Sequence, residues 1–268
     1  MAEGSRHGCP ILVRCLRAIL GDDTDDRHST KGSLASAMLS CLIGTMSTPM
    51  PETRVHTSSF VEIAIVSFLC FGLFIVTSLG AVASGSSQQK HFADASLLSL
   101  VLIEAVLAAL TLGFLTLRTY PIGRLRPTPG RLDTAIGIGL FASGYVATVL
   151  AYLLVAPGND VGSQPITRML AEGHRSFLVV LVVSTVNGLY EETFLLGYLM
   201  DALRAQGASI AIGLTCLARL LYHLYQGPVG AFSVTVWGVV IGLFYWRTKR
   251  LWPAILAHQL TDLVGLAS

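Results

Sequence analysis

Hydrophobic and polar positions divide the chain into two parts of different character. From Phe60 onward, long apolar blocks alternate with short polar breaks, and the blocks run roughly over residues 60–83, 95–117, 134–156, 176–200, 208–225, 229–246 and 251–267. The earlier blocks reach the length that a bilayer-spanning helix needs, about 20 residues, whereas the last three are shorter and carry polar residues. Because backbone groups in lipid must be hydrogen-bonded within their own segment, we predict a helix for each block.

The pattern therefore predicts an all-α, polytopic membrane protein with about seven transmembrane helices around a polar cavity. The break at Gln226-Gly227-Pro228 leaves six or eight helices open, since it could also be a kink within the membrane. Residues 1–58 hold apolar stretches too short to span a bilayer. We predict a disordered or surface-lying extension over residues 1–58 and a transmembrane helical domain over residues 59–268, with Met46 or Met50 as alternative start sites.

Composition narrows the class further. Hydrophobic residues make up 53% of the chain and charged residues 13%, about half of the roughly 25% usual in soluble domains. Twelve of the 34 charged side chains lie in residues 1–58, which leaves 22 for the other 210 residues. A soluble globule needs a charged surface on all sides, so this class is excluded for the larger part of the chain. The formal net charge of +2 gives no sign of a nucleic-acid partner.

The charges of the polar breaks predict an orientation. If the N-terminus is cytosolic, nine Lys and Arg residues fall inside and three fall outside; the outside set is Lys90, Arg168 and Arg175. The positive-inside rule then favours a cytosolic N-terminus and, with seven helices, a C-terminus on the other side. Arg outnumbers Lys 15 to 3, which is typical of a GC-rich bacterial genome and indicates a bacterial cytoplasmic membrane.

Ionisable groups inside the apolar blocks point to function. Each costs roughly 3 kcal/mol on membrane-insertion scales, so such groups are functional candidates by default. We interpret Glu62 as structural, because it lies at the start of its helix, where its carboxylate can stay at the wet interface. Glu104 is alone in the middle of its block and is expected to bond a neighbouring helix or to shape a cavity.

Six further polar groups form three clusters in the C-terminal half. Glu191 and Glu192 are adjacent and point about 100° apart on a helix, so one can enter a cavity while the other bonds a neighbouring helix or solvent. The other clusters are pairs spaced four apart, each on one helical face: Arg219 with His223, and His258 with Asp262. The sequence holds no His-Glu-x-x-His zinc signature, no Gly-x-Ser-x-Gly elbow and no P-loop.

This order of motifs resembles the CPBP family of intramembrane proteases, which includes type II CAAX prenyl endopeptidases and bacteriocin-processing and lysostaphin-resistance-like proteins. The resemblance covers about residues 170–268. The family's Glu-Glu-x-x-x-Arg motif is matched at Glu191 and Glu192, but Leu196 stands where the family has Arg.

The second and third motifs also lie in this region. The family's Phe-x-x-x-His motif is matched at His223, with Arg219 in place of Phe, and the last motif is matched at His258 and Asp262. The phrase Tyr-His-Leu-Tyr-Gln-Gly looks like a bacterial subgroup of the family. Arg219 is our candidate for supplying, from another helix, the cation that Leu196 does not.

The resemblance implies an endopeptidase that hydrolyses a peptide bond in a membrane-associated protein or peptide, as in CAAX-box protein processing. One of the two glutamates, with His223, would hold and deprotonate a water, His258 would stabilise the oxyanion, and Asp262 would orient His258. Arg219 and Glu104 would support the substrate and the cavity. We expect no cofactor; the alternative is zinc held by Glu191, His223 and His258.

Two other functions stay open. The substitution at Leu196 also fits a non-catalytic CPBP-like membrane protein with an immunity or peptide-binding role. A proton-relay transporter is the third reading, because intramembrane Glu and His serve relays, although the halves show no inverted repeat. The expected partners are the lipid bilayer and a peptide or membrane-protein substrate; the sequence does not indicate an oligomeric state.

Overall fold

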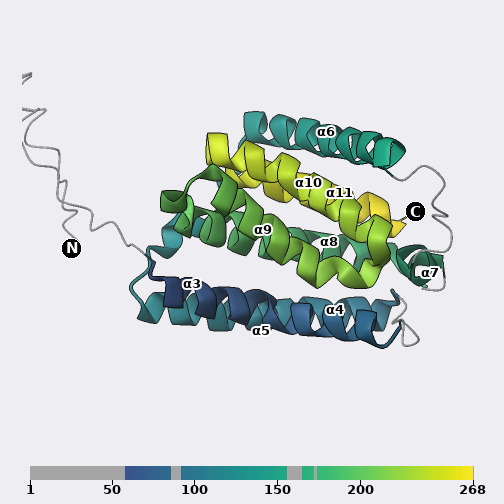
Figure 1. Cartoon of the computed structure of the whole chain (residues 1–268), viewed down its shortest axis with the longest axis horizontal. Helices are drawn as coiled ribbons and strands as arrows, with labels where there is room; N and C mark the ends of the chain where they lie inside the picture. The colour runs from purple at the N-terminus through teal and green to yellow at the C-terminus, as the bar shows by residue number, and fades with distance from the viewer. Residues whose placement is uncertain (1–57, 86–91, 156–164, 172–173, 268) are drawn as a thin grey trace, which may run out of the picture. The chain divides into compact units, whose positions relative to one another are not determined.

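The computed structural model describes residues 58–85, 92–155, 165–171 and 174–267 (Figure 1). Every regular element in these ranges is a helix, which confirms the all-α prediction. Of the extension predicted over residues 1–58, all but Ser58 lies outside the described residues.

Helices occupy each of the predicted apolar blocks in the described part of the chain. The long stretches are α3, η1 and α4 in succession (Phe60–Ser67, Phe68–Gly72, Leu73–Ala83), α5 (Asp94–Leu117), α6 (Arg131–Val155), α8 with the π-helix η4 (Phe177–Glu192, Thr193–Met200), α9 (Ala208–His223), α10 (Gly227–Thr248) and α11 (Leu251–Ala267). Shorter elements connect them: η2 (Ile122–Leu125), α7 (Pro165–Ala171), η5 (Arg204–Gln206) and η6 (Leu224–Gln226).

Five stretches are long and apolar enough to cross a membrane: Phe60–Ala83, Asp94–Leu117, Arg131–Leu153, Phe177–Met200 and Ala208–Thr248. The last of these is folded back on itself: η6 separates α9 from α10, Gly227 at the start of α10 has a φ of 86°, and the two helices pack together. The break at residues 226–228 is thus a reversal of the chain. The protein is an integral helical membrane protein, and the count of seven spans stays a prediction.

The long stretches run alternately in opposite directions, so that the start of α3 and the end of α11 lie at opposite ends of the bundle (Figure 1). The first stretch contacts α5 through η1, α5 contacts α8, and α8 contacts α11; α11 contacts α6, α6 contacts α10, and α10 contacts α9, which returns to α4. In the most apolar 18-residue segment of each span, 56% of the α8 stretch is buried inside the protein, compared with only 17% of α5. The α8 stretch is therefore the central helix, and it carries the two glutamates.

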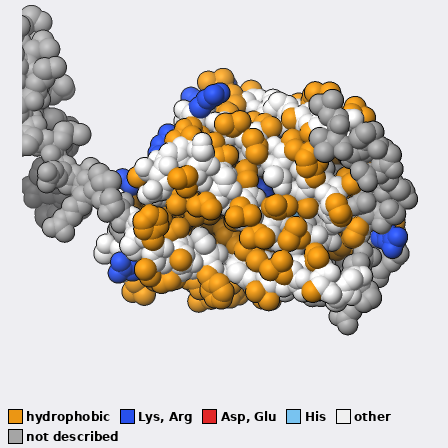
Figure 2. Space-filling view, viewed as in Figure 1, with side chains coloured by type: hydrophobic (Ala, Val, Ile, Leu, Met, Phe, Trp, Pro, Cys, Tyr) orange, Lys and Arg blue, Asp and Glu red, His pale blue; other side chains and the backbone are white. Residues whose placement is uncertain are grey.

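The outer surface is apolar in the middle of the bundle. Figure 2 shows hydrophobic side chains spread over the middle of one face, with Lys and Arg groups mainly toward its ends. On α5, for example, Leu102, Val106 and Leu110 are each more than half exposed. Because water would be a poor solvent for such a surface, a lipid bilayer is the environment that these side chains fit.

The expectation that Glu62 lies at a wet interface is wrong. Its side chain is only 2% exposed, and its carboxylate accepts hydrogen bonds from Nε of Arg118 and from the hydroxyl of Tyr198, each at 3.3 Å. Glu62 therefore ties the first helix to the end of α5 and to η4. Its structural role is consistent with these contacts.

Candidate active site

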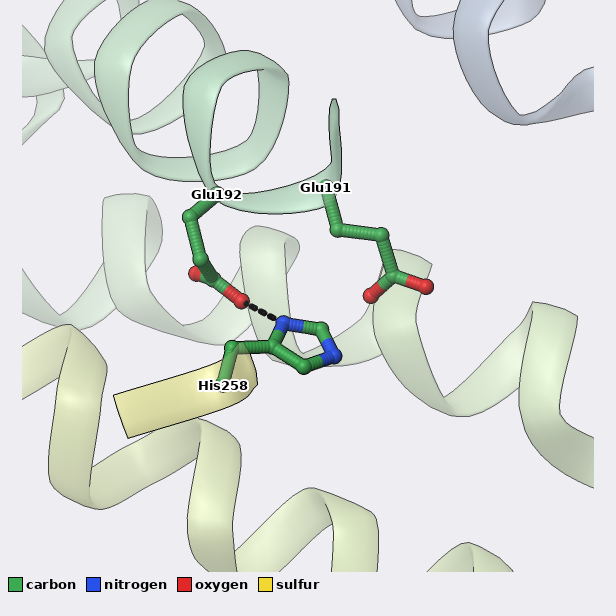
Figure 3. Close-up of side chains that lie close together, drawn as sticks. All are labelled: Glu191, Glu192 and His258. Atoms are coloured by element: carbon green, nitrogen blue, oxygen red, sulfur yellow. Dashed lines mark hydrogen bonds and ion pairs between the residues drawn. The ribbon is translucent and has the colours of Figure 1, made fainter. Parts of the chain in front are cut away.

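The adjacent glutamates lie where α8 passes into the π-helix η4, and π-helical segments often occur at functional sites. Glu191 is 6% exposed and Glu192 is fully buried. Figure 3 shows both side chains extending from the α8 stretch, with His258 of α11 beside them. Glu191 lines a cavity, whereas Glu192 bonds side chains of two neighbouring helices, a division that suits adjacent helical residues.

A close approach of two helices brings His258 to this pair. A Cβ atom on Gly188 would lie 3.0 Å from the backbone N of Gln259 and 3.3 Å from the backbone O of Ile255, so a larger residue here would push α8 and α11 apart slightly. Glu192 lies about one turn beyond Gly188 on α8, and Nδ1 of His258 donates a hydrogen bond of 2.6 Å to its Oε1 (Figure 3).

Arg219 of α9 lies between the two carboxylates. Its NH1 group donates to Oε2 of Glu191 at 3.2 Å, and its NH2 group donates to Oε1 of Glu192 at 2.6 Å. The hydroxyl of Tyr222 also donates to Oε2 of Glu191, at 2.5 Å. Leu196, in contrast, lies in the apolar core. A cation therefore reaches the glutamates from α9 and not from the position that the family motif uses.

His258 is held between two acidic groups. Besides its bond to Glu192, its Nε2 lies 3.5 Å from Oδ2 of Asp262 on the same helix. Asn187 of α8 completes the group: its Nδ2 donates to Oδ2 of Asp262 at 2.7 Å and lies 3.5 Å from Nε2 of His258. The edge of the Trp237 ring packs on His258 with ring centroids 5.0 Å apart.

Sequence reasoning missed Asn187, Tyr222 and Trp237. Asn187 precedes Glu191 by four residues, so a search for polar residues on the same helical face would have found it. Tyr222 stands directly before His223, within a motif already singled out. Trp237 gives no signal in the sequence, because one aromatic residue in an apolar helix is ordinary.

A cavity of about 350 Å³ opens beside these groups. At one end it is lined by the cluster just described, and at the other by Ile166 of α7, Gln226 of η6 and Leu266 of α11. α7 and the last turn of α11 lie at the end of the bundle where the described chain stops (Figure 1). The cavity thus extends from the middle of the bundle toward that end.

His223 lines the same cavity but stands apart from the tight cluster. Its Nδ1 donates to the backbone oxygen of Arg219 at 2.9 Å, which leaves Nε2 as an acceptor. Among the described residues, the ionisable side chains whose ligand atoms lie within 4.8 Å of one another are Glu191, Glu192 and His258. The alternative zinc site predicted from the sequence consists of Glu191, His223 and His258. In the structure, Glu192 takes the place of His223 in the cluster.

Glu104 of α5 also lines the cavity, as expected for a cavity-shaping residue. Its side chain is 2% exposed, and its Oε2 is buried without a hydrogen-bond partner in the part of the chain that the structure describes. It therefore differs from Glu191, Glu192 and Asp262, each of which is bonded to the cluster.

Taken together, the fold and the site define a polytopic helical membrane protein with a buried Glu, His and Arg cluster beside a cavity. Comparison with protein families identifies one family: residues 173–264 match the model described as type II CAAX prenyl endopeptidase Rce1-like. This segment, about a third of the chain, contains the whole cluster, and the match confirms the resemblance to membrane proteases of the CPBP family. Neither the curated proteins nor the solved structures gave a match to the chain.

Proposed function

We propose that the protein is an intramembrane endopeptidase that hydrolyses a peptide bond in a membrane-associated protein or peptide. The observation that carries the proposal is the meeting of Glu191, Glu192 and His258, from α8 and α11, at the inner end of a cavity within the apolar bundle. Ionisable groups buried within a membrane carry a large free-energy cost, so their presence there points to a function. The family match over residues 173–264 supports the same class of activity.

Glu191 is the general base in this proposal. Its Oε2 is fixed by Arg219 and Tyr222, while the residue lines the cavity, so a carboxylate oxygen can meet a water there. His223, whose Nε2 is an acceptor, would hold the second hydrogen of that water. Glu191 takes one proton, the water oxygen bonds the scissile carbon, and Glu191 returns the proton to the leaving amine as the C–N bond breaks.

The oxyanion of the tetrahedral intermediate needs hydrogen-bond donors. Asp262 only accepts hydrogen bonds when ionised, so it does not contact the oxyanion directly. Glu192 bonds Nδ1 of His258 and Asp262 lies 3.5 Å from its Nε2, so a hydrogen on Nε2 would be held at the cavity and available to donate. Asn187 supplies a second donor, since its Nδ2 lies 3.5 Å from that Nε2. Glu192 and Asp262 thus position His258, while His258 and Asn187 contact the oxyanion.

We propose that the reaction needs no metal. A zinc ion bound by Glu191, Glu192 and His258 would use two carboxylates that each already bond the guanidinium of Arg219 through one oxygen. The positive charge of Arg219, itself only 2% exposed, would repel a dication held by the same groups. The donor set therefore does not fit zinc, and no step of the mechanism involves a metal.

The test is cleavage of a peptide library by the purified protein, with and without exhaustive chelation, followed by mass spectrometry. We expect the wild type to cleave equally in both conditions. His258→Ala and Asn187→Leu should each lower kcat about 100-fold or more, as the loss of one oxyanion donor does, with little change in KM. Absence of any product from the wild type would exclude the endopeptidase, and activity lost on chelation and restored by zinc would exclude the metal-free mechanism.

We also propose that the protein lies in a bacterial cytoplasmic membrane with its N-terminal side in the cytosol. Two described basic residues belong to the end of the bundle where Figure 1 labels α7: Arg168 is in α7, and Arg175 directly precedes α8. Eight lie in or beside the links at the opposite end, which join α5 to α6, η4 to α9 and α10 to α11: Arg118, Arg124, Arg126, Arg131, Arg204, Arg247, Lys249 and Arg250. The positive-inside rule makes the richer end cytosolic. The cavity, which extends toward the α7 end, would then admit peptide from the non-cytosolic side.

Cysteine labelling in intact cells tests this orientation. In a cysteine-free background, we expect Ser176→Cys to react with a membrane-impermeant maleimide added outside, since Ser176 is exposed at the α7 end. Thr248→Cys, exposed at the other end, should react only after the membrane is permeabilised. The reverse pattern would contradict the orientation.

A further inference from the structure

We infer that Glu104 is a binding site for the ammonium or guanidinium group of a basic side chain in the peptide substrate. The inference rests on the proposed function and adds a substrate class to it. Glu104 lies outside the matched segment of residues 173–264 and outside the hydrogen-bonded cluster. It is therefore a feature of this chain that the proposed reaction leaves unused.

The Glu104 carboxyl lacks the partners that a buried acid normally has. It makes no hydrogen bond or ion pair with any described residue, and its Oε2 is shielded from solvent. A buried charge without a partner is costly, and a buried carboxylate is ordinarily paired with a cation or hydrogen-bonded. Because Glu104 faces the cavity, a ligand in the cavity can supply that partner.

The cations that line the cavity are already engaged elsewhere. Arg219 bonds both Glu191 and Glu192, and His258 lies between Glu192 and Asp262. Of the acidic side chains on the cavity wall, Glu104 is the one that forms no ion pair with a described residue. The cavity consequently carries an excess of acidic groups, which favours a positively charged ligand over a neutral or anionic one.

The walls of the cavity suit a cation as well. Phe71, Phe74 and Tyr190 line it together with Glu104, and their rings contact one another at centroid distances of 6.2 and 6.4 Å. Aromatic faces attract Lys and Arg groups, and the attraction grows where water is excluded. They also cover the methylene stem of such a side chain.

Glu104 also borders a second, largely apolar hollow of about 420 Å³ between α5, η2 and α8. Arg126 lines that hollow, and Glu191 does not. A peptide that presents its scissile bond to Glu191 occupies the first cavity, so the basic side chain meets Glu104 from that side.

The test starts from a peptide that the wild type cleaves. Each position around the cleaved bond is occupied in turn by Lys or by norleucine, and kcat/KM is compared for the two peptides of each pair. At one position we expect the wild type to favour Lys about tenfold or more, the scale of one charge-assisted hydrogen bond. Glu104→Gln should reduce this ratio to near one. Glu62→Gln is the matched control, since Glu62 is equally buried but does not line the cavity, and it should keep the wild-type ratio.

The ratio does not depend on the fraction of protein that is folded, so a destabilised variant still gives an answer. A wild type that cleaves without preferring Lys at any position, or a preference that persists in Glu104→Gln, would overturn the inference and leave the endopeptidase intact. If the wild type cleaves nothing, the proposed function fails, and binding of Lys and norleucine peptide libraries is measured instead. A Lys preference that Glu104→Gln removes then supports the cation site, and equal binding of both libraries overturns it.

Discussion

Glu191→Gln is expected to lower kcat for peptide hydrolysis by about 10³-fold, within the range of roughly 10²–10⁴ that general-base catalysis contributes. The amide is nearly the same size as the carboxylate and can still accept hydrogen bonds from Arg219 and Tyr222 through its oxygen. It cannot take a proton from water. Rates of product formation in detergent micelles, with KM measured alongside, check the prediction.

Glu62→Gln is the control for Glu191→Gln as well, because it changes a buried carboxylate that lies away from the cavity. We expect it to keep kcat within a few-fold of the wild type once folded protein is quantified. A Glu191→Gln variant that retains wild-type kcat would show that another group deprotonates the water, and the mechanism would have to be assigned anew.

Arg219→Met is expected to destabilise the folded protein by about 3–5 kcal/mol, because it removes the partner of two buried carboxylates. Both carboxylates and the guanidinium are at most 6% exposed, so water cannot replace the lost bonds. The measurement is the free energy of unfolding in a mixed-micelle denaturant titration. Activity should fall as well, since Glu191 loses one of the groups that orient it.

The double variant Arg219→Met with Glu192→Gln tests the cause of this loss. Removing one of the unpaired charges should recover part of the stability, so the effects of the two substitutions should not add.

Arg250→Met is the surface control: its pair with Asp133 is 2.8 Å long, but Arg250 is 45% exposed and water screens it, so the cost should stay within about 1 kcal/mol. Equal losses for Arg219→Met and Arg250→Met would contradict the role given to Arg219.

Much of the fold could be predicted from the pattern of apolar residues alone. A helix in lipid satisfies its backbone hydrogen bonds locally, so the length and composition of a block suffice to place a helix such as Asp94–Leu117. The break at Gly227 was recognised, but its outcome was not, because a kink and a reversal look alike in sequence. The packing of α9 on α10 makes it a reversal.

Glu62 shows where such local reasoning fails. Its place at the start of a helix suggested contact with water, yet Arg118 and Tyr198 reach it from segments distant in sequence and bury it. The same limit applied to Asn187, which meets Asp262 only because α8 and α11 pack together.

For this protein, the sequence by itself determined the membrane class, the positions of the helices and the set of ionisable residues that are costly inside a bilayer and therefore candidates for a function. These properties depend on the free energy of each segment or side chain in an apolar solvent, which is local. Only the tertiary structure decided that Arg219 bonds both glutamates, that Glu191 faces the cavity while Glu192 holds His258, and that Oε2 of Glu104 meets no hydrogen-bond partner among the described residues. Those facts depend on distances between atoms of different helices. The close packing of helices at positions such as Gly188 sets these distances, and the sequence of a single helix does not contain them.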